Sequence, residues 1–278
     1  MRITRRTWLH FQWGLMATGL FACGAQGGVP VASVSAPAPV PAPIPVTQEE
    51  VWVSTFPEDD AVSAICETIL AEAYRRMGLR LRVRHAPGER ALQLSNSGEV
   101  DGELYRMRGI DDQFRELVPV PVELHEARFM AFMARDDVPM ASAADLRGWR
   151  VAYNRGAKAV ERNLPPGLHT EAAHSQSNMF ERLGAGRFDV VIDDHLSGML
   201  TLTRLGLKHI KARGPLFVVP LIHYVHQRHR DRVAPLTRIL REMKQSGEMA
   251  RLIMGATDRL TEQAVAHGRA RAAMPGRF

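Results

Sequence analysis

Few side chains in this sequence are spaced for covalent catalysis. Asp194 and His195 form the one acid/base pair that we would test. There is no nucleophile elbow and no HExxH pair, and Cys66 lies in an expected helix without a visible base to activate its thiol. The residue types therefore favour a non-catalytic binding function, and the Asp194–His195 pair is the enzymatic alternative.

Metal ligands and cofactor motifs are equally sparse. His223, His226 and His229 recur at a spacing of three, which would place neighbours on one side of a helix, but Leu221–Val225 has the pattern of a strand. The two cysteines form no CxxC pair, and neither a GxGxxG nor a phosphate-loop pattern follows a strand. We expect no metal site and no cofactor, and we interpret the histidines as a partly solvated helix start.

Length and charge limit the function classes further. The 278 residues exceed a usual single domain, and 45% hydrophobic with 24% charged residues excludes a wholly disordered chain or a polytopic membrane protein. The net charge of +6 comes mostly from the two ends of the chain. Without residues 1–28 and 261–278, 30 basic and 29 acidic residues remain. Such a nearly neutral body lacks the electrostatic footprint of a nucleic-acid-binding protein.

The N-terminus has the composition of an export signal. Arg2, Arg5 and Arg6 precede an apolar stretch, Trp8–Ala22, that is shorter than a membrane span. The arginine pair resembles a twin-arginine motif, and Leu20–Cys23 resembles a lipobox whose cysteine becomes acylated. We therefore predict a signal peptide over 1–23 with lipidation at Cys23; a retained helix is the alternative.

A proline-rich segment follows the signal. Residues 29–46 contain six of the seventeen prolines and no charge, which favours an extended, semi-rigid spacer. We predict a linker over 24–46 and a folded body from residue 47. A tolerated unstructured leader is the simpler alternative.

Strand and helix patterns alternate through the body. A strand pattern at Glu50–Phe56 precedes apolar residues at helical spacing from Asp59 or Asp60 to Met77, with Gly78 as the expected C-terminal cap. Further alternation predicts an α/β fold with lobes. The other expected elements are strands at 79–84, 100–105, 128–134, 149–153 and 188–192, and helices at 89–94, from 142, at 156–162, up to 183 and at 231–243.

Several segments together resemble the extracytoplasmic solute-binding proteins of the amino-acid-binding kind (family 3-like), which have the type II periplasmic binding fold and serve ABC transporters. The resemblance covers residues 50 to 255, and the order and spacing of its pieces carry it. These pieces are Ala71–Gly78, Pro87–Leu92, Gly98–Gly102, Leu146–Val151, Gly186–Asp189 and Asp194.

The resemblance implies two α/β lobes joined by two crossing strands, with a ligand in the cleft and closure by hinge bending. We expect the first lobe to comprise 47–125 and 219–262, the second 126–218, and a disordered tail 263–278. The resemblance further implies a monomer that delivers a small polar solute, amino-acid-like or a carboxylate, to a membrane transporter. A membrane sensor is the alternative partner.

Candidate ligand-binding residues follow from the rule that open α/β sheets bind ligands beyond the carboxyl ends of their strands. An arginine fork suits a carboxylate, Asp194 suits an ammonium group, and Phe56 suits an apolar part. These strand ends and helix starts supply Thr55, Phe56, Asp59, Tyr105, Arg106, Asn154, Arg155, Gly156, Ala157 and Asp194.

Each candidate also has a structural interpretation. Arg106 is equally consistent with a surface position, Asp194 with a helix cap, and Gly156 with backbone freedom. Amino-acid binders carry their carboxylate-holding arginine several residues past the Asp-Gly turn, where this sequence has Gln113.

Overall fold

The structure, a computed structural model, describes residues 49–56, 60–135 and 140–273. All of them belong to the unit formed by residues 46–278. The expected signal, the linker and Cys23 lie outside the described residues, as does Asp59.

One eight-stranded sheet runs through this unit in the order β2-β1-β3-β8-β4-β7-β5-β6. At one end β1 pairs in parallel with β2 and β3, and at the other β5 pairs in parallel with β6 and β7. The strands are β1 (Glu50–Thr55), β2 (Arg80–His85), β3 (Gly102–Met107), β4 (Leu117–Met133), β5 (Arg150–Asn154), β6 (His169–Ala173), β7 (Val190–Asp194) and β8 (Lys211–His226).

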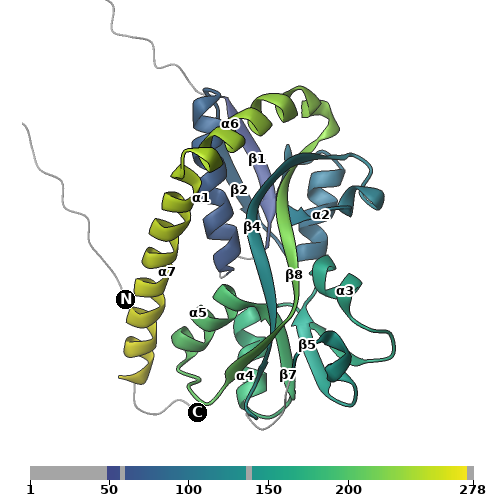
Figure 1. Cartoon of the computed structure of the whole chain (residues 1–278), viewed down its shortest axis with the longest axis vertical. Helices are drawn as coiled ribbons and strands as arrows, with labels where there is room; N and C mark the ends of the chain where they lie inside the picture. The colour runs from purple at the N-terminus through teal and green to yellow at the C-terminus, as the bar shows by residue number, and fades with distance from the viewer. Residues whose placement is uncertain (1–48, 57–59, 136–139, 274–278) are drawn as a thin grey trace, which may run out of the picture. The chain divides into compact units, whose positions relative to one another are not determined.

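The two central strands are far longer than the sequence predicted. β4 and β8 pair antiparallel from Leu117 opposite His226 to Met133 opposite Lys211, with breaks in register, and they connect the two ends of the sheet (Figure 1). Their length was missed because prolines such as Pro119 and Pro220 usually argue against a central strand. The expected lobe boundaries at 125/126 and 218/219 fall inside these two strands.

Helices cover both ends of the sheet, so that two lobes form. The first lobe is the β2-β1-β3 end with α1, α2 and α6, and the second is the β7-β5-β6 end with α3, α4 and α5 (Figure 1). This confirms the expected two-lobed α/β fold. The helices are α1 (Ala61–Arg76), α2 (Gly88–Asn96), α3 (Lys158–Asn163), α4 (Gln176–Gly184), α5 (His195–Leu205), α6 (Val233–Gln245) and α7 (Glu248–Ala272), with 3-10 turns at Ile110–Asp112, Ala143–Leu146 and Gln227–Arg232.

The C-terminal helix α7 corrects one prediction. Residues 263–272, expected to be disordered, continue this helix, which packs on α1 of the first lobe and α5 of the second (Figure 1). Ala256 and Ala264 are its buried contacts here, and Gly268 lies against the backbone of Thr203. Large apolar residues at helical spacing, such as Met249, Ile253 and Leu260, end before residue 263, and the last part of the helix packs through Ala264 and Gly268, so the sequence pattern did not reveal that the helix continues. Residues 274–278 lie outside the described residues.

The expected first helix is confirmed in detail. Asp60 caps α1 by accepting the backbone N–H of Ser63 at 2.9 Å, and Gly78 adopts a left-handed φ of 76° after the helix ends. α1 buries Ile65, Ile69 and its neighbours against the sheet, and Cys66 is fully buried among them. Cys66 is therefore a core residue, and burial raises the pKa of its thiol.

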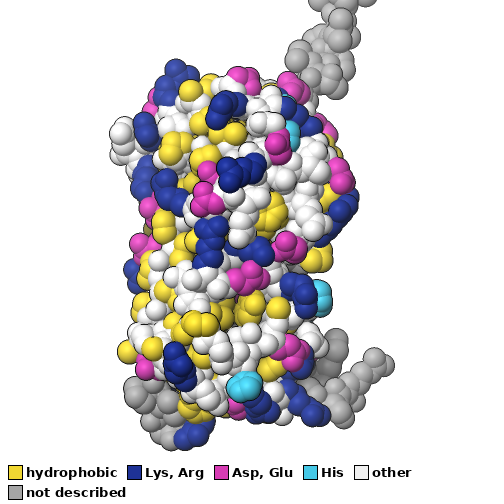
Figure 2. Space-filling view, turned by 90° about the vertical axis from the view of Figure 1, so that its right-hand side faces the viewer, with side chains coloured by type: hydrophobic (Ala, Val, Ile, Leu, Met, Phe, Trp, Pro, Cys, Tyr) yellow, Lys and Arg dark blue, Asp and Glu magenta, His cyan; other side chains and the backbone are white. Residues whose placement is uncertain are grey.

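Two further observations concern the helices and the surface of the described chain. No helix among the described residues is both long and apolar enough to span a membrane. On the face drawn in Figure 2, acidic and basic side chains are interspersed and do not gather into one patch of a single sign.

Candidate functional site

A cleft lies between the lobes at the carboxyl ends of β1, β3, β5 and β7. The space in it that the centre of a water-sized sphere can occupy is about 80 Å³, and the cleft is partly open to solvent, so a small ligand can enter it. The candidate residues that line it are Phe56, Tyr105, Arg106, Asn154, Arg155, Ala157 and Asp194.

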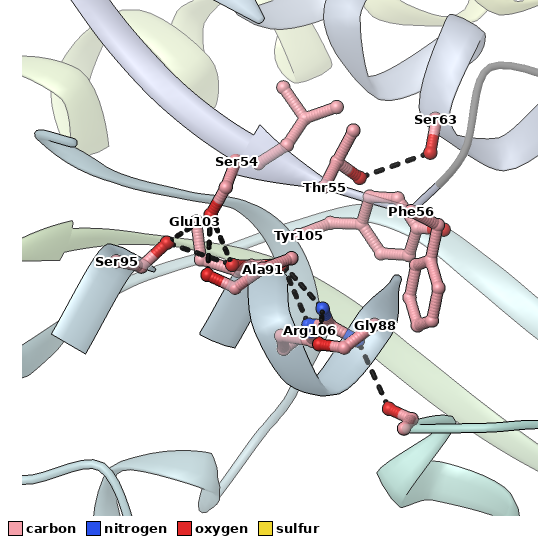
Figure 3. Close-up of polar contacts among 12 residues, drawn as sticks. Ser54, Thr55, Phe56, Ser63, Gly88, Ala91, Ser95, Glu103, Tyr105 and Arg106 are labelled. Carbon is pink, nitrogen blue, oxygen red and sulfur yellow. Dashed lines mark hydrogen bonds and ion pairs between the residues drawn. The ribbon is translucent and has the colours of Figure 1, made fainter. Parts of the chain in front are cut away.

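Two other candidates lie beside the cleft. Thr55 is fully buried and its hydroxyl contacts that of Ser63 at 3.0 Å, so it supports the start of α1 (Figure 3). Gly156 has a φ of 79° and presses against the backbone of Gly88 and Glu89 from the opposite lobe. Its conformation suits glycine, as the structural interpretation expected.

Arg106 is the most enclosed cation of the cleft. Its side chain is 3% exposed, and Nε donates to Glu103 Oε1 at 2.8 Å, with Nη2 2.7 Å from the same oxygen. Nη2 also donates to Gly88 O at 3.0 Å and Nη1 to Gly156 O at 3.2 Å (Figure 3). The guanidinium carbon lies 4.0 Å from the centre of the Phe56 ring. Arg106 is thus neither a surface arginine nor one with a free fork.

Glu103 is held in turn by two serines. Ser54 Oγ donates to Glu103 Oε2 at 2.9 Å and Ser95 Oγ donates to the same oxygen at 2.8 Å (Figure 3). Burial raises the pKa of Glu103, while the Arg106 charge and the serine hydroxyls oppose that rise. The sequence reasoning missed Glu103, because strand alternation places residues three apart on opposite faces. A register shift in β3 between Glu103 and Arg106 brings them together.

Aromatic rings form one wall of the cleft. Phe56 and Tyr105 lie with their ring centres 5.9 Å apart (Figure 3). Phe129 of β4 also lines the cleft, and it stacks on Phe217 of β8 with ring centres 4.9 Å apart. Such a wall can take the apolar part of a ligand or the face of a cation.

Asp60, which the sequence indicated only as a helix start, also lines the cleft. Besides capping α1, its Oδ2 accepts the Tyr105 hydroxyl, and its Oδ1 accepts Ser197 Oγ of the second lobe at 2.9 Å. Burial raises the pKa of Tyr105 well above its usual value, and the neighbouring Asp60 charge adds to that rise. The helix cap therefore also contacts the other lobe.

Asp194 and its neighbour Asp193 end β7 at the cleft. Asp194 caps α5 through the backbone N–H groups of Leu196 at 3.0 Å and Ser197 at 3.2 Å, which confirms the cap interpretation. Asp193, which the sequence reasoning did not select, accepts Gln176 Nε2 at 2.5 Å. Burial raises the pKa of Asp193 well above its usual value, and the charges of Asp60 and Asp194 raise it further.

The proposed acid/base pair does not form at the cleft. His195 is exposed and does not line the cleft, and the Asp194 carboxylate accepts backbone N–H groups. The imidazole that lies near the Asp194 carboxylate is instead that of His125, with Nε2 3.8 Å from Asp194 Oδ2. This geometry gives no support to general acid–base chemistry by His195.

The three C-terminal histidines serve different structural contacts. His223 is fully buried and bonds the Tyr74 hydroxyl at 2.8 Å, while His229 Nε2 lies 2.7 Å from Asp101 Oδ1. His223 belongs to β8, which confirms the strand pattern at Leu221–Val225, but its full burial contradicts the interpretation of the histidines as part of a solvated helix start. Within the described ranges, no group of three or more His, Cys, Asp or Glu side chains could hold a metal ion.

Ion pairs and hydrogen bonds join the lobes at the cleft mouth. Lys158 of the second lobe lies 2.8 Å from Glu89 of the first and 2.9 Å from Glu161. Arg162 Nη2 donates to Gly109 O across the same gap at 2.8 Å. Arg155 is exposed at this mouth.

Known proteins provide a test of this architecture. No family model matches the chain. An uncharacterized protein of Shewanella oneidensis is 26% identical over 188 residues, 65% of this chain and 71% of the relative.

Solved structures match more of the chain. An amino acid ABC transporter substrate-binding protein, AbpA from Streptococcus pneumoniae, bound to L-arginine, covers 76% of this chain and 96% of its own, with a TM-score of 0.64 and 16% identity. The chain has the type II periplasmic binding fold. The same fold is matched by a histidine kinase sensor domain with similarity to periplasmic binding proteins (TM-score 0.61, 16% identity, 74% and 94% covered).

A third match with this fold is the ancestral amino-acid-binding protein AncCDT-1, a precursor of cyclohexadienyl dehydratase (TM-score 0.60, 15% identity, 75% and 95% covered). At such identities these matches establish the type II fold but not a ligand. The fold is that of binding proteins in most of the structures matched here, and the cleft described above is where the two lobes of such a fold meet.

Proposed function

We propose that the chain is an extracytoplasmic solute-binding protein that captures a small amino-acid-like solute by hinge closure and delivers it to an ABC-type transporter. The observation that carries the proposal is the cleft itself, which has polar groups from both lobes around an aromatic wall. Such a site gains its contacts only when the lobes close on the solute, and it requires no covalent step.

Charge in the cleft supports a solute with a cationic nitrogen. Asp60, Asp193 and Asp194 all line it, and none of them is in ion-pair contact with a lysine or arginine of the described chain. An ammonium or guanidinium group of the solute would meet these carboxylates, and the Phe56–Tyr105 wall would cover its apolar part. Arg155, exposed at the mouth, is the cation that remains for a carboxylate of the solute.

A thermal-shift panel tests this proposal. The panel contains L-arginine, L-lysine, L-glutamine, polyamines, dicarboxylates and aromatic acids. A ligand at 100 times its dissociation constant should add about 2.7 kcal/mol to the free energy of unfolding. We expect basic amino acids to raise the unfolding temperature and dicarboxylates to leave it unchanged. A panel in which no member acts, or only the dicarboxylates do, contradicts the proposal.

Asp194, the last residue of β7, and Asp189, just before its first residue, provide a test variant and a matched control. Asp194→Asn keeps an oxygen for the helix cap but removes the charge at the cleft, so the ligand-induced shift should fall. Asp189→Asn removes a carboxylate that pairs with Arg150 at 2.7 Å, at the opposite end of the strand. The ligand-induced shift of this second variant should equal that of the unchanged chain.

The membrane partner and the location belong to the same proposal. The signal at 1–23 and a lipidated Cys23 would place a monomeric body outside the cytoplasmic membrane, beside a permease. A sensor kinase is the alternative partner, supported by the match to a histidine kinase sensor domain. Crosslinking in membranes, followed by identification of the crosslinked protein, separates a permease from a kinase.

A cleft enzyme of the same fold is the remaining alternative, prompted by the match to the dehydratase precursor. We propose that this chain is not an enzyme. Turnover in a substrate screen that is abolished by His195→Ala would overturn this part of the proposal.

A further inference from the structure

We propose that Arg106 acts as a latch of the cleft, beside the contacts of Lys158 with Glu89 and of Arg162 with Gly109, and that it is not the residue that binds a ligand carboxylate. The inference rests on the proposed capture function, because it concerns the closure and the specificity of the same cleft. It follows from the partners of the guanidinium, from the position of Glu103, and from the close approach of the two lobes at Gly156.

The hydrogen bonds of Arg106 leave little of its fork free. A guanidinium has five N–H donors. Nε and one Nη2 hydrogen face Glu103, the other Nη2 hydrogen faces Gly88 O, and one Nη1 hydrogen faces Gly156 O. A bidentate bond to a ligand carboxylate needs two parallel free donors. Arg106 has at most one.

Glu103 also removes the electrostatic reason for a carboxylate to bind here. It is fully buried, it lies against the guanidinium, and Ser54 and Ser95 fix its second oxygen. Glu103 therefore already occupies the Nε–Nη2 side of the guanidinium that a ligand carboxylate would use. A buried fork held in this way has a fixed direction, which suits a contact to backbone carbonyl groups that move into place.

The two carbonyl partners belong to different lobes. Gly88 begins α2 of the first lobe, and Gly156 precedes α3 of the second (Figure 3). When the cleft opens, Gly156 O moves away from Nη1, while the bonds to Glu103 and Gly88 stay within the first lobe. The Arg106–Gly156 bond is therefore made only in the closed form, and it biases the lobes toward closure.

Gly156 allows this contact because it lacks a side chain. A Cβ atom there would overlap the backbone nitrogen of Glu89 and approach Gly88 C at 2.7 Å. Gly167, in the same lobe, has the same φ of 79°, and a Cβ atom added there would meet nothing within 4 Å, so it carries the same backbone strain without the clash. The two glycines form a matched pair for a test.

Hydrogen exchange of the ligand-free full chain is the first measurement. Gly156→Ala should raise the amide exchange rates of the segments around Gly88 and Ala157 several-fold, because the wedge prevents the lobes from meeting. Gly167→Ala should leave those two segments at the rate of the unchanged chain. Equal exchange of the two variants at both segments would overturn the latch.

Ligand dissociation is the second measurement, with L-arginine and agmatine as probes. Agmatine is arginine without its carboxylate. Arg106→Lys keeps a charge beside Glu103 but cannot reach both carbonyl groups with a rigid fork. If Arg106 is a latch, Arg106→Lys should raise the dissociation rates of L-arginine and agmatine by the same factor, on the order of ten-fold.

The alternative has a different signature. If Arg106 binds the ligand carboxylate, Arg106→Lys weakens L-arginine and leaves agmatine unchanged, and the proposal fails. If neither probe binds the unchanged chain, that result counts against the proposed function, and hydrogen exchange of ligand-free Arg106→Lys then decides the latch: an exchange rate at the Ala157 segment equal to that of the unchanged chain overturns it.

Discussion

His223 illustrates how burial controls protonation inside the sheet. Its imidazole is fully buried, Nε2 bonds the Tyr74 hydroxyl, and Nδ1 lies 2.8 Å from the carbonyl oxygen of Glu103. Burial lowers the pKa of His223 from 6.5 to about 4, although the backbone carbonyl groups of Leu104 and Glu103 favour the charged form. The side chain is therefore neutral in the folded protein at neutral pH.

A pH dependence of stability follows from this shift. Between pH 6.5 and pH 4 the unfolded chain binds a proton at His223 that the folded chain does not, so stability falls as the pH falls through this window and changes no further below it. The full effect is about 3 kcal/mol. We expect His223→Asn to have a lower free energy of unfolding than the unchanged protein at pH 7. Urea unfolding should show this difference decrease by about the same amount, 3 kcal/mol, between pH 7 and pH 4.

The exposed His195 serves as the control for that measurement, since His195→Asn should change the free energy of unfolding by less than about 0.5 kcal/mol. A deficit of His223→Asn that stays constant from pH 7 to pH 4 contradicts a neutral buried imidazole.

Arg106 marks the limit of prediction at the residue scale. Its position at a strand end, and therefore at the cleft, followed from the rule for α/β sheets. Its partners did not, because two of them are backbone carbonyl oxygens and the third, Glu103, reaches it only through an irregular register in β3. Asp193 was missed because the strand was expected to end at residue 192. In the structure β7 continues to Asp194, and Asp193 is a buried residue of this strand.

Helix α7 carries the clearest prediction at the element scale. It contains Gly255 and Gly268, and alanine is favoured over glycine inside a helix by about 1 kcal/mol. At Gly255 an added Cβ meets only the end of the Arg259 side chain at 3.5 Å, so Gly255→Ala should stabilise the protein by about that amount. At Gly268 the same atom would lie 2.5 Å from Thr203 O of α5.

Gly268→Ala should therefore lower the free energy of unfolding by about 1–3 kcal/mol, the usual cost of overpacking. Urea unfolding of both variants measures the two effects, and the sign should differ between them. A stabilising Gly268→Ala would show that α7 does not pack on α5 as described.

Other elements show where sequence patterns succeed. α1 was predicted closely because its apolar spacing, its Asp60 cap and its terminal Gly78 agree. β4 and β8 were predicted only in part because prolines and register breaks interrupt their alternation. The strand β6, His169–Ala173, was not predicted, since it is largely exposed and lacks a buried apolar pattern.

At the scale of the whole molecule, alternating strands and helices were sufficient for the two-lobed fold, because each lobe is built from local strand and helix units. The contacts between lobes were not predictable. They depend on carbonyl groups, on side chains such as Lys158 and Ser197 that lie far from their partners in sequence, and on a helix near the end of the chain.

That helix has a kinetic consequence. α7 packs on α1 in one lobe and on α5 in the other, and it contributes nothing to the described lining of the cleft. An opening that moves α1 and α5 apart would have to break the contact of α7 with one of them. The dissociation rates of solutes with very different affinities would then have the same upper limit, which is set by α7, although α7 does not line the cleft.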